Sequence, residues 1–151
     1  MPEILTITLN PAVDVSSSVD RVVAGPKLRC EAPRQDPGGG GVNVARAISR
    51  LGGISTAFVA LGGESGKQYA SMLEAESIDV VAFPVTGDTR QSFAFLETST
   101  NRLYRFHLPG PAWPPEQTAA MLDQLEPCLT AGGIAVISGS LPPGVPADIA
   151  S

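Results

Sequence analysis

The chain has 151 residues, of which 43% are hydrophobic and 17% charged, and its formal net charge is −5. This length and composition suit one soluble globular domain with a sizeable core, and they argue against disorder. The positive charges form no cluster that would favour nucleic acid as a partner. No apolar run approaches the roughly 20 residues that span a bilayer, so no membrane segment is predicted.

The cysteines and the first residues indicate the compartment. Cys30 and Cys128 lie far apart and form no CxxC pair, which argues against a disulfide scaffold or a zinc site and favours a reducing environment. Glu3 places an acidic residue where a signal peptide carries basic charge. We therefore expect a cytoplasmic protein.

The first half of the chain predicts a strand and a helix joined by glycines. Residues 4–9 form a short apolar run that ends at Asn10-Pro11 and predicts a buried strand, and residues 13–36 fit exposed strands. After Pro37, four glycines lead into a helix that Gly52 and Gly53 end. Its apolar residues recur at helical spacing, with Arg46 facing away from them. These residues are Val42, Ala45, Ile48 and Leu51.

The rest of the chain continues this alternation. A strand over 54–61, a turn at 62–68 and a helix that covers 66–76 predict a parallel α/β sheet. Residues 91–97 and 102–107 alternate in polarity and predict a hairpin. A helix starts at Pro114-Pro115, and residues 134–138 are typical of a central parallel strand. The predicted apolar stripe of this last helix is Met121, Leu122, Leu125 and Leu129.

The four glycines before the first helix are the strongest local signal. Backbone N–H groups at a helix start can face an oxygen-rich ligand, and Asn43 offers both a donor and an acceptor. A tight strand-to-helix connection without a ligand explains the same pattern. The element is not the dinucleotide fingerprint G-x-G-x-x-G, because Asn43 stands where the last glycine should be.

Other motif-like features favour ordinary structural roles. Residues 62–68 echo a P-loop, but the glycine spacing is one residue short and Gln68 replaces the residue that holds magnesium. His107 is the sole histidine, so no histidine pair is available for a metal, and we expect no metal site. We expect Trp113 to pack in the interior.

Several motifs together resemble one family. T-L-N-P-A-V-D (residues 8–14), K-L-R-C-E-A-P (27–33), P-G-G-G-G-V-N-V-A-R-A (37–47), T-R-Q (89–91), Y-R-F (104–106) and S-G-S-L-P-P-G-V (138–145) occur in this order. This order resembles the N-terminal half of PfkB-family, or ribokinase-like, carbohydrate kinases across essentially the whole chain. Within the family, the Lys-Leu-Arg stretch and the fourfold glycine are most similar to the minor-type 6-phosphofructokinase branch.

The resemblance implies a Rossmann-like ribokinase fold, in which a central α/β sheet is covered by a small β-sheet lid. Residues 15–35 and 89–108 would be the two lid segments. In this branch the lid also forms a homodimer interface. Open sheet edges and apolar surface on an isolated lid would agree with such pairing.

The resemblance also implies roles for particular residues. Asp14 would accept hydrogen bonds from sugar hydroxyls, although a lone aspartate at a turn is commonly a cap. Arg90 would bind the phosphate of the sugar bidentately. Lys27, Arg29 and Arg105 would be lid cations that contact phosphates, across the dimer or within it, or that are simply exposed. The remaining members of the substrate site would be Gly38, Gly39, Gly40, Gly41, Asn43 and Ser140.

The implied reaction is ATP-dependent phosphorylation of fructose 6-phosphate, with Mg²⁺, in glycolysis. The family's G-A-G-D-type segment, which carries the catalytic base, does not occur in residues 1–151, nor do the expected adenine and magnesium contacts. We therefore expect the catalytic base to lie C-terminal to Ser151 and the isolated chain to be inactive and poorly soluble. Two alternatives stay open: a kinase for fructose 1-phosphate, tagatose 6-phosphate or a nucleoside, and a non-catalytic sugar-phosphate-binding module.

Overall fold

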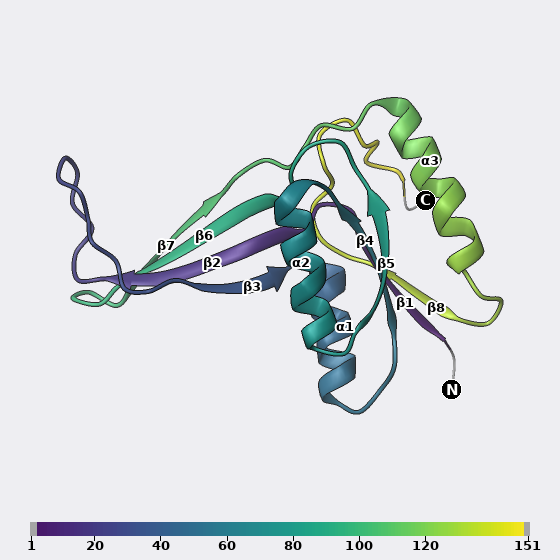
Figure 1. Cartoon of the computed structure of the whole chain (residues 1–151), viewed down its shortest axis with the longest axis horizontal. Coiled ribbons are helices and arrows are strands. Elements are labelled where there is room, and N and C mark those ends of the chain that lie inside the picture. Colours follow the sequence, from purple (N-terminus) through teal and green to yellow (C-terminus); the bar gives the residue numbers. More distant parts are fainter. Residues whose placement is uncertain (1–2, 150–151) are drawn as a thin grey trace.

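The computed structural model describes residues 3–149 and contains two four-stranded sheets. The first is the core sheet and the second projects from it as an arm (Figure 1). The elements are β1 (Ile4–Thr8), β2 (Ala12–Val19), β3 (Arg34–Gly38), α1 (Gly40–Arg50), β4 (Thr56–Leu61), α2 (Gly63–Ala75), β5 (Asp79–Pro84), β6 (Arg90–Glu97), β7 (Arg102–His107), α3 (Pro115–Leu125), a 3₁₀ turn (Glu126–Cys128) and β8 (Ile134–Ile137).

The core sheet has the order β5-β4-β1-β8, and all its strands are parallel. Helices α1 and α2 cover one face and α3 covers the other, so the core has three layers (Figure 1). The predicted α/β fold with parallel pairing is confirmed. None of the helices within residues 3–149 is long and apolar enough to cross a membrane.

Alternation along β4 divides the interior into two clusters. Val59 and Leu61 face α1 and α2, where they pack with Tyr69. Phe58 faces the other way and stacks on Phe83, whose ring also lies 5.6 Å from that of Trp113. The predicted packing role of Trp113 is confirmed, since the side chain is buried.

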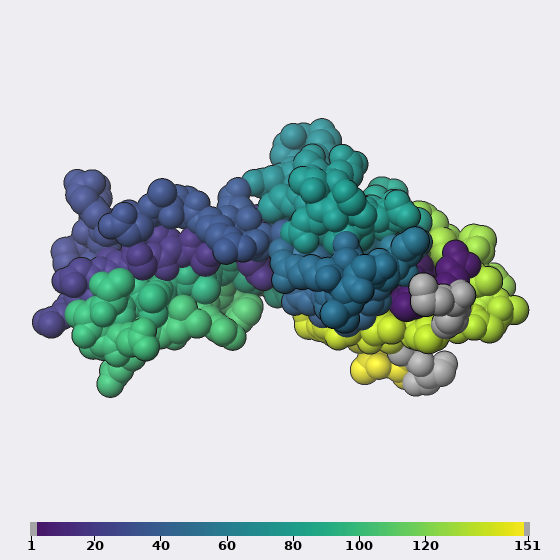
Figure 2. Space-filling model, turned by 90° about the horizontal axis from the view of Figure 1, so that it is seen from below, coloured from purple at the N-terminus to yellow at the C-terminus, as the bar shows by residue number. Residues whose placement is uncertain are grey.

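The arm sheet has the order β3-β2-β6-β7. Strand β2 pairs antiparallel with β3 and parallel with β6, and β6 and β7 form the predicted hairpin. In the space-filling view the arm is a separate lobe beside the core (Figure 2). The first of the two chain segments that form the arm runs from Ala12 to Gly38, so it is longer than the predicted segment 15–35. Within it, residues 20–33 form a loop and not a strand.

Helix α1 starts directly against the end of β1. Thr8, buried on the α1 side of the core sheet, accepts a hydrogen bond from the backbone N–H of Val42 (2.9 Å). A Cβ atom at Gly41 would lie 2.6 Å from Thr8 Oγ1, so a larger residue there would push the helix away. Glycine at this position therefore permits the close contact between helix and strand.

A network centred on Arg46 connects both helices to the base of the arm. Its guanidinium lies 2.7 Å from the Glu76 carboxylate and 3.7 Å from that of Asp36 on β3. Arg46 was predicted to face away from the apolar residues of this helix, and these partners leave only 14% of its side chain exposed. Hydrogen bonding to Glu76 raises the pKa of Arg46, so the residue stays charged.

Several predicted boundaries need correction. Leu51 and Ile54 lie in the exposed connection between α1 and β4 instead of on the buried faces. Helix α2 begins at Gly63, so most of the predicted turn at 62–68 is helical. The apolar pattern of the sequence extends to Leu51 and Ile54, although the core covers neither residue.

The end of the described chain also differs from expectation. Leu122 and Leu129 are exposed, and of the predicted apolar stripe only Met121 is fully buried. Strand β8 is an edge of the core sheet as described, with Ile134 and Ile137 partly exposed, although its apolar run is typical of a central strand. Apolar composition alone does not distinguish these positions.

We expect the Tyr69→Phe substitution to lower the free energy of unfolding by about 1–3 kcal/mol, because it leaves a buried carbonyl without its partner. The Tyr69 hydroxyl donates to the carbonyl of Gly38 (2.8 Å), and burial raises the pKa of Tyr69, so the donor stays protonated. Urea unfolding would measure the change. Tyr104→Phe, on the half-buried tyrosine of β7, is the matched control. Equal stability of the two variants would contradict the prediction.

Candidate functional site

A groove of about 460 Å³ lies between one face of the arm and α1. Four polar side chains from successive strands form one row along it: Asp36, Asp14, Ser92 and His107. The next row, one pleat away, places Arg34 at one edge of the sheet and Arg105 at the other. This size falls in the range of small-molecule sites.

Asp14 occupies the middle of the row and reaches back towards the core. A Cβ atom at Gly38 would collide with the Asp14 carboxylate, so a larger residue there would displace this side chain. Partial burial raises the pKa of Asp14, while the nearby charges of Arg90 and His107 oppose that rise. Asp14 and Gly38, two of the predicted sugar-contacting residues, are therefore close neighbours.

The other predicted glycines pack against the ends of the core strands. The N–H of Gly41 donates to the carbonyl of Ser138 (3.1 Å), and Gly40 lies against Ser138 and Gly139. Gly39 is the N-cap of α1, and Asn43 is exposed in the first helical turn. Much of the fourfold glycine therefore has a packing role, which the sequence left open beside the ligand role.

Arg90 and Ser140 come together at the first crossing from the core to the arm. The amide of Asn10 donates to Ser140 Oγ (3.0 Å), and Arg90 Nη2 donates to the same oxygen (3.3 Å). Arg90 also donates to the carbonyl of Asn10 from Nε and Nη2, at 3.3 and 3.1 Å, and to that of Leu108 from Nη1, at 3.2 Å. Residues far apart in the sequence thus meet around one guanidinium.

These contacts limit what Arg90 can offer a ligand. A guanidinium has five N–H donors, and Arg90 makes four hydrogen bonds within the chain. One N–H of Nη1 therefore remains for a ligand while the four bonds are intact. The predicted bidentate contact with a phosphate requires Arg90 to exchange one of its present partners.

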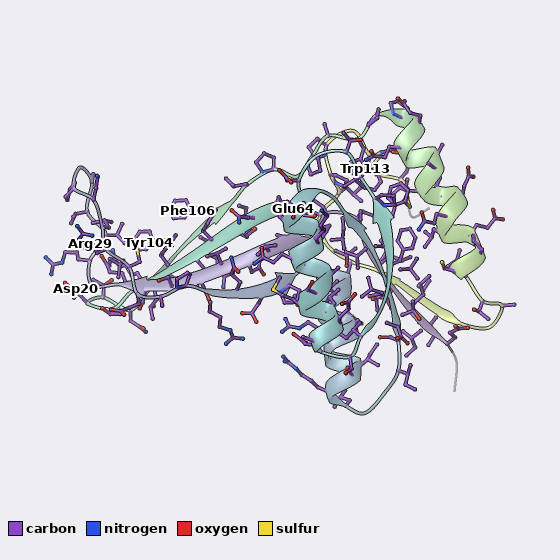
Figure 3. The ribbon with its side chains drawn as sticks, in the orientation of Figure 1. Asp20, Arg29, Glu64, Tyr104, Phe106 and Trp113 are labelled. Atoms are coloured by element: carbon purple, nitrogen blue, oxygen red, sulfur yellow. The ribbon has the colours of Figure 1, made fainter. Side chains whose placement is uncertain are left out.

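The lid cations divide into two groups. Arg105 lines the groove on β7, in the row next to that of Asp14. Lys27 and Arg29 lie in the exposed loop after β2, and Arg29 is at the far end of the arm (Figure 3). These two residues do not meet Asp14 or Arg90 within one chain.

The sequence reasoning missed three members of this neighbourhood. Asn10 was named only as part of a motif, although it is buried and holds Ser140 and Arg90. Ser92 and His107 received no ligand role, yet both line the groove beside Asp14. Their alternation with apolar neighbours marks them as one face of a strand, but only the register shows that this face is the one with Asp14.

The described residues offer a divalent metal no ready site. Within residues 3–149 no three His, Cys, Asp or Glu side chains gather as a metal centre. The acidic pair of the groove, Asp14 and Asp36, has arginines as its neighbours. The chemistry that these residues support is the binding of a polar, anionic small molecule.

Comparison with known proteins gives consistent matches. The chain is 45% identical over 147 residues to an ATP-dependent 6-phosphofructokinase isozyme 2 of Mycobacterium tuberculosis, covering 97% of this chain and 43% of that protein. It is 34% identical to a 1-phosphofructokinase of Xanthomonas campestris, covering 95% of this chain and 45% of the relative. The crystal structure of phosphofructokinase-2 from Escherichia coli in complex with fructose-6-phosphate superposes with a TM-score of 0.92 at 39% identity, covering 99% of this chain and 49% of that one.

The chain therefore spans about half the length of the curated relatives that it matches. The model of the pfkB family of carbohydrate kinases matches residues 5–151, which is nearly all of the sequence. The fold, the order of the motifs and this match agree, and the chain belongs to the pfkB carbohydrate kinase family.

Proposed function

We propose that this chain is the N-terminal, sugar-binding half of an ATP-dependent kinase that phosphorylates fructose 6-phosphate to fructose 1,6-bisphosphate. The observation that carries the proposal is the convergence of Asp14, Arg90 and Ser140 beside the glycine start of α1. The names of the relatives agree with a phosphofructokinase but include enzymes for either phosphate isomer.

Each residue has a chemical task in this proposal. The Asp14 carboxylate accepts hydrogen bonds from sugar hydroxyls, and Asn43 and the backbone of Gly38–Gly41 complete the hydroxyl contacts. Arg90 neutralises the phosphate, and Ser140, which accepts from Arg90, can donate its own proton to a ligand oxygen. ATP with Mg²⁺ would supply the transferred phosphoryl group, held by residues outside this chain.

The restriction to a sugar site has a consequence for activity. Phosphoryl transfer depends on positioned charge and a base near the attacking hydroxyl, and the predicted base lies beyond Ser151. We propose that residues 1–151 bind substrate without turning it over. Two free cysteines, with Cys30 exposed, also support the proposed cytoplasmic location, because such thiols persist in reducing compartments.

A substrate panel tests the function. In a full-length protein that contains residues 1–151, ATP-dependent turnover should be highest with fructose 6-phosphate, compared with fructose 1-phosphate and tagatose 6-phosphate. Arg90→Ala should raise KM for fructose 6-phosphate about ten-fold or more, since a charge-assisted hydrogen bond is lost. Arg102→Ala, on an exposed arginine at the far end of β7, is the matched control.

Several results would overturn this proposal. A clear preference for another sugar phosphate would contradict the substrate. A normal KM for the Arg90→Ala protein would contradict the role of Arg90. Turnover by residues 1–151 alone at the rate of the full-length protein would contradict the division between a binding half and a catalytic half.

Asp14→Asn should separate binding from stability. Because the pKa of Asp14 is raised in the folded chain, the ionised carboxylate lowers stability at neutral pH, and this cost is lost as the pH falls through the raised pKa. The substitution should therefore raise Tm slightly while weakening fructose 6-phosphate binding about ten-fold or more. Asp20→Asn, at the exposed end of the arm (Figure 3), should change neither quantity. A lower Tm for Asp14→Asn would contradict the prediction.

We further propose that two copies of the chain pair through the arm. The face of the arm opposite the groove carries stacked aromatic rings, with Phe93 and Phe95 6.3 Å apart and Phe106 edge-on to Phe95 at 6.5 Å. Phe106 is 53% exposed, and Tyr104 lies on the same face (Figure 3). A second copy would cover this surface, and homodimers with self-complementary interfaces are the commonest oligomers.

Phe106→Ser should weaken the dimer, so that the sedimentation coefficient measured by analytical ultracentrifugation shifts towards that of a monomer. Loss of an exposed aromatic ring from the proposed interface is the physical reason. Leu103→Ser is the matched control, because Leu103 is similarly exposed on the same strand but faces the groove side. A dimer that resists Phe106→Ser as well as it resists Leu103→Ser would exclude this interface.

A further inference from the structure

His107 is a titratable groove residue to which the proposed function gives no task. It is the sole histidine of the sequence, it ends β7 and it is exposed to the groove. Its Nδ1 atom lies 3.2 Å from the hydroxyl of Ser92, which is buried. Because a hydroxyl can donate to a neutral ring or accept from a charged one, this contact holds the ring in either protonation state.

The held ring leaves Nε2 as the nitrogen that can meet a ligand in the groove. Histidine changes charge near neutral pH, so this nitrogen is a donor on the cationic ring. Asp14 and His107 stand two strands apart in the same row, which corresponds to about 10 Å at the usual strand spacing. A sugar whose hydroxyls reach Asp14 can therefore place a distal anionic group at His107.

Arg90, beside the groove at the crossing from the core to the arm, has limited capacity for a phosphate. Four of its five N–H donors already bond protein atoms. One of these bonds goes to the carbonyl of Leu108, the residue directly after His107. A phosphate near the remaining N–H of Arg90 thus lies within one residue of the histidine along the chain. His107 can supply a second N–H donor to the phosphate in place of the Arg90 donors that bond protein atoms.

The groups that face His107 across the groove are two paired arginines, two further arginines and one acid. On β3, Arg34 is paired with Asp36, and on α1, Arg46 is paired with Glu76 and Asp36. Asp14 on β2 is the acid in the row of His107, while Arg105 on β7 and Arg50 on α1 are fixed cations of the same groove. Histidine is the residue type in this set that can change charge between pH 5 and 8.

We infer that His107 is a specificity-determining residue that binds the phosphate of the sugar through Nε2 and makes substrate affinity depend on pH. The inference rests on the proposed sugar-phosphate site. It assigns the distal phosphate to a shared donor set of Arg90 and His107, so that fructose 6-phosphate binds more tightly when the ring is charged. Unphosphorylated fructose gains nothing from the same charge.

The test is a binding titration of residues 1–151 with fructose 6-phosphate, inorganic phosphate and fructose between pH 6 and 8.5. NMR of the single histidine reports the ring directly, and added fructose 6-phosphate should move the midpoint of its titration to higher pH. Between pH 6 and 8.5 the affinity of the wild type for fructose 6-phosphate should fall by a factor about ten-fold larger than the factor by which the affinity of His107→Gln falls. The comparison with His107→Gln corrects for the phosphate group, which itself titrates near pH 6.

His107→Lys provides the second variant, since lysine is a cation throughout this range. It should bind fructose 6-phosphate with little dependence on pH beyond that of His107→Gln, and more tightly than His107→Gln at pH 8.5. Circular dichroism and thermal unfolding of each variant would show that the fold is retained.

The outcomes distinguish the two proposals. Identical pH dependence in the wild type and His107→Gln, or a histidine signal that does not respond to fructose 6-phosphate although the sugar binds, overturns the role of His107 alone. Absence of wild-type binding to both fructose 6-phosphate and inorganic phosphate overturns the role of His107 together with the proposed site. Equal binding of fructose and fructose 6-phosphate likewise excludes a phosphate contact.

Discussion

The contact between the start of α1 and the end of β1 is the constraint on which the remaining structure depends. The Thr8 hydroxyl accepts a hydrogen bond from the N–H of Val42 (2.9 Å), and Gly41 allows the helix to approach the strand this closely. The same few residues end β3, start α1 and lie against the turn after β8. The arm leaves the core beside this contact, so the position of Asp14 follows from how closely the helix meets the sheet.

A second constraint comes from the charges at the base of the arm. Arg46 and Glu76 form a partly buried ion pair, and Asp36 extends it to β3. Removal of one partner would leave a partly buried charge without a counter-charge, which lowers the stability of the folded chain. The network therefore favours one orientation of the arm over the core, and it lies at the edge of the groove where a change in orientation would alter the spacing of the rows.

Local sequence signals predicted the elements well and the contacts between distant elements less well. The glycines before α1, the hairpin of β6 and β7 and the parallel core could be predicted, because turn chemistry and apolar periodicity are local properties. The row that joins Asp14, Ser92 and His107 could not, since register between strands distant in sequence depends on how the whole sheet pairs. Leu51 was misplaced for a related reason: periodicity shows which face a residue occupies, but not whether a neighbour covers it.

The two lobes also differ in how strongly they are held, and this difference affects how the molecule loses structure. The core has a continuous interior on both sides of its sheet, whereas the outer part of the arm is mostly exposed or half-buried and ends in the long loop that carries Arg29. Segments with few buried apolar contacts open locally at lower free energy than the molecule as a whole. Cooperative melting of the core would then be preceded by fraying of the arm, and the row of polar side chains would lose its alignment while the Rossmann-like layers were still intact.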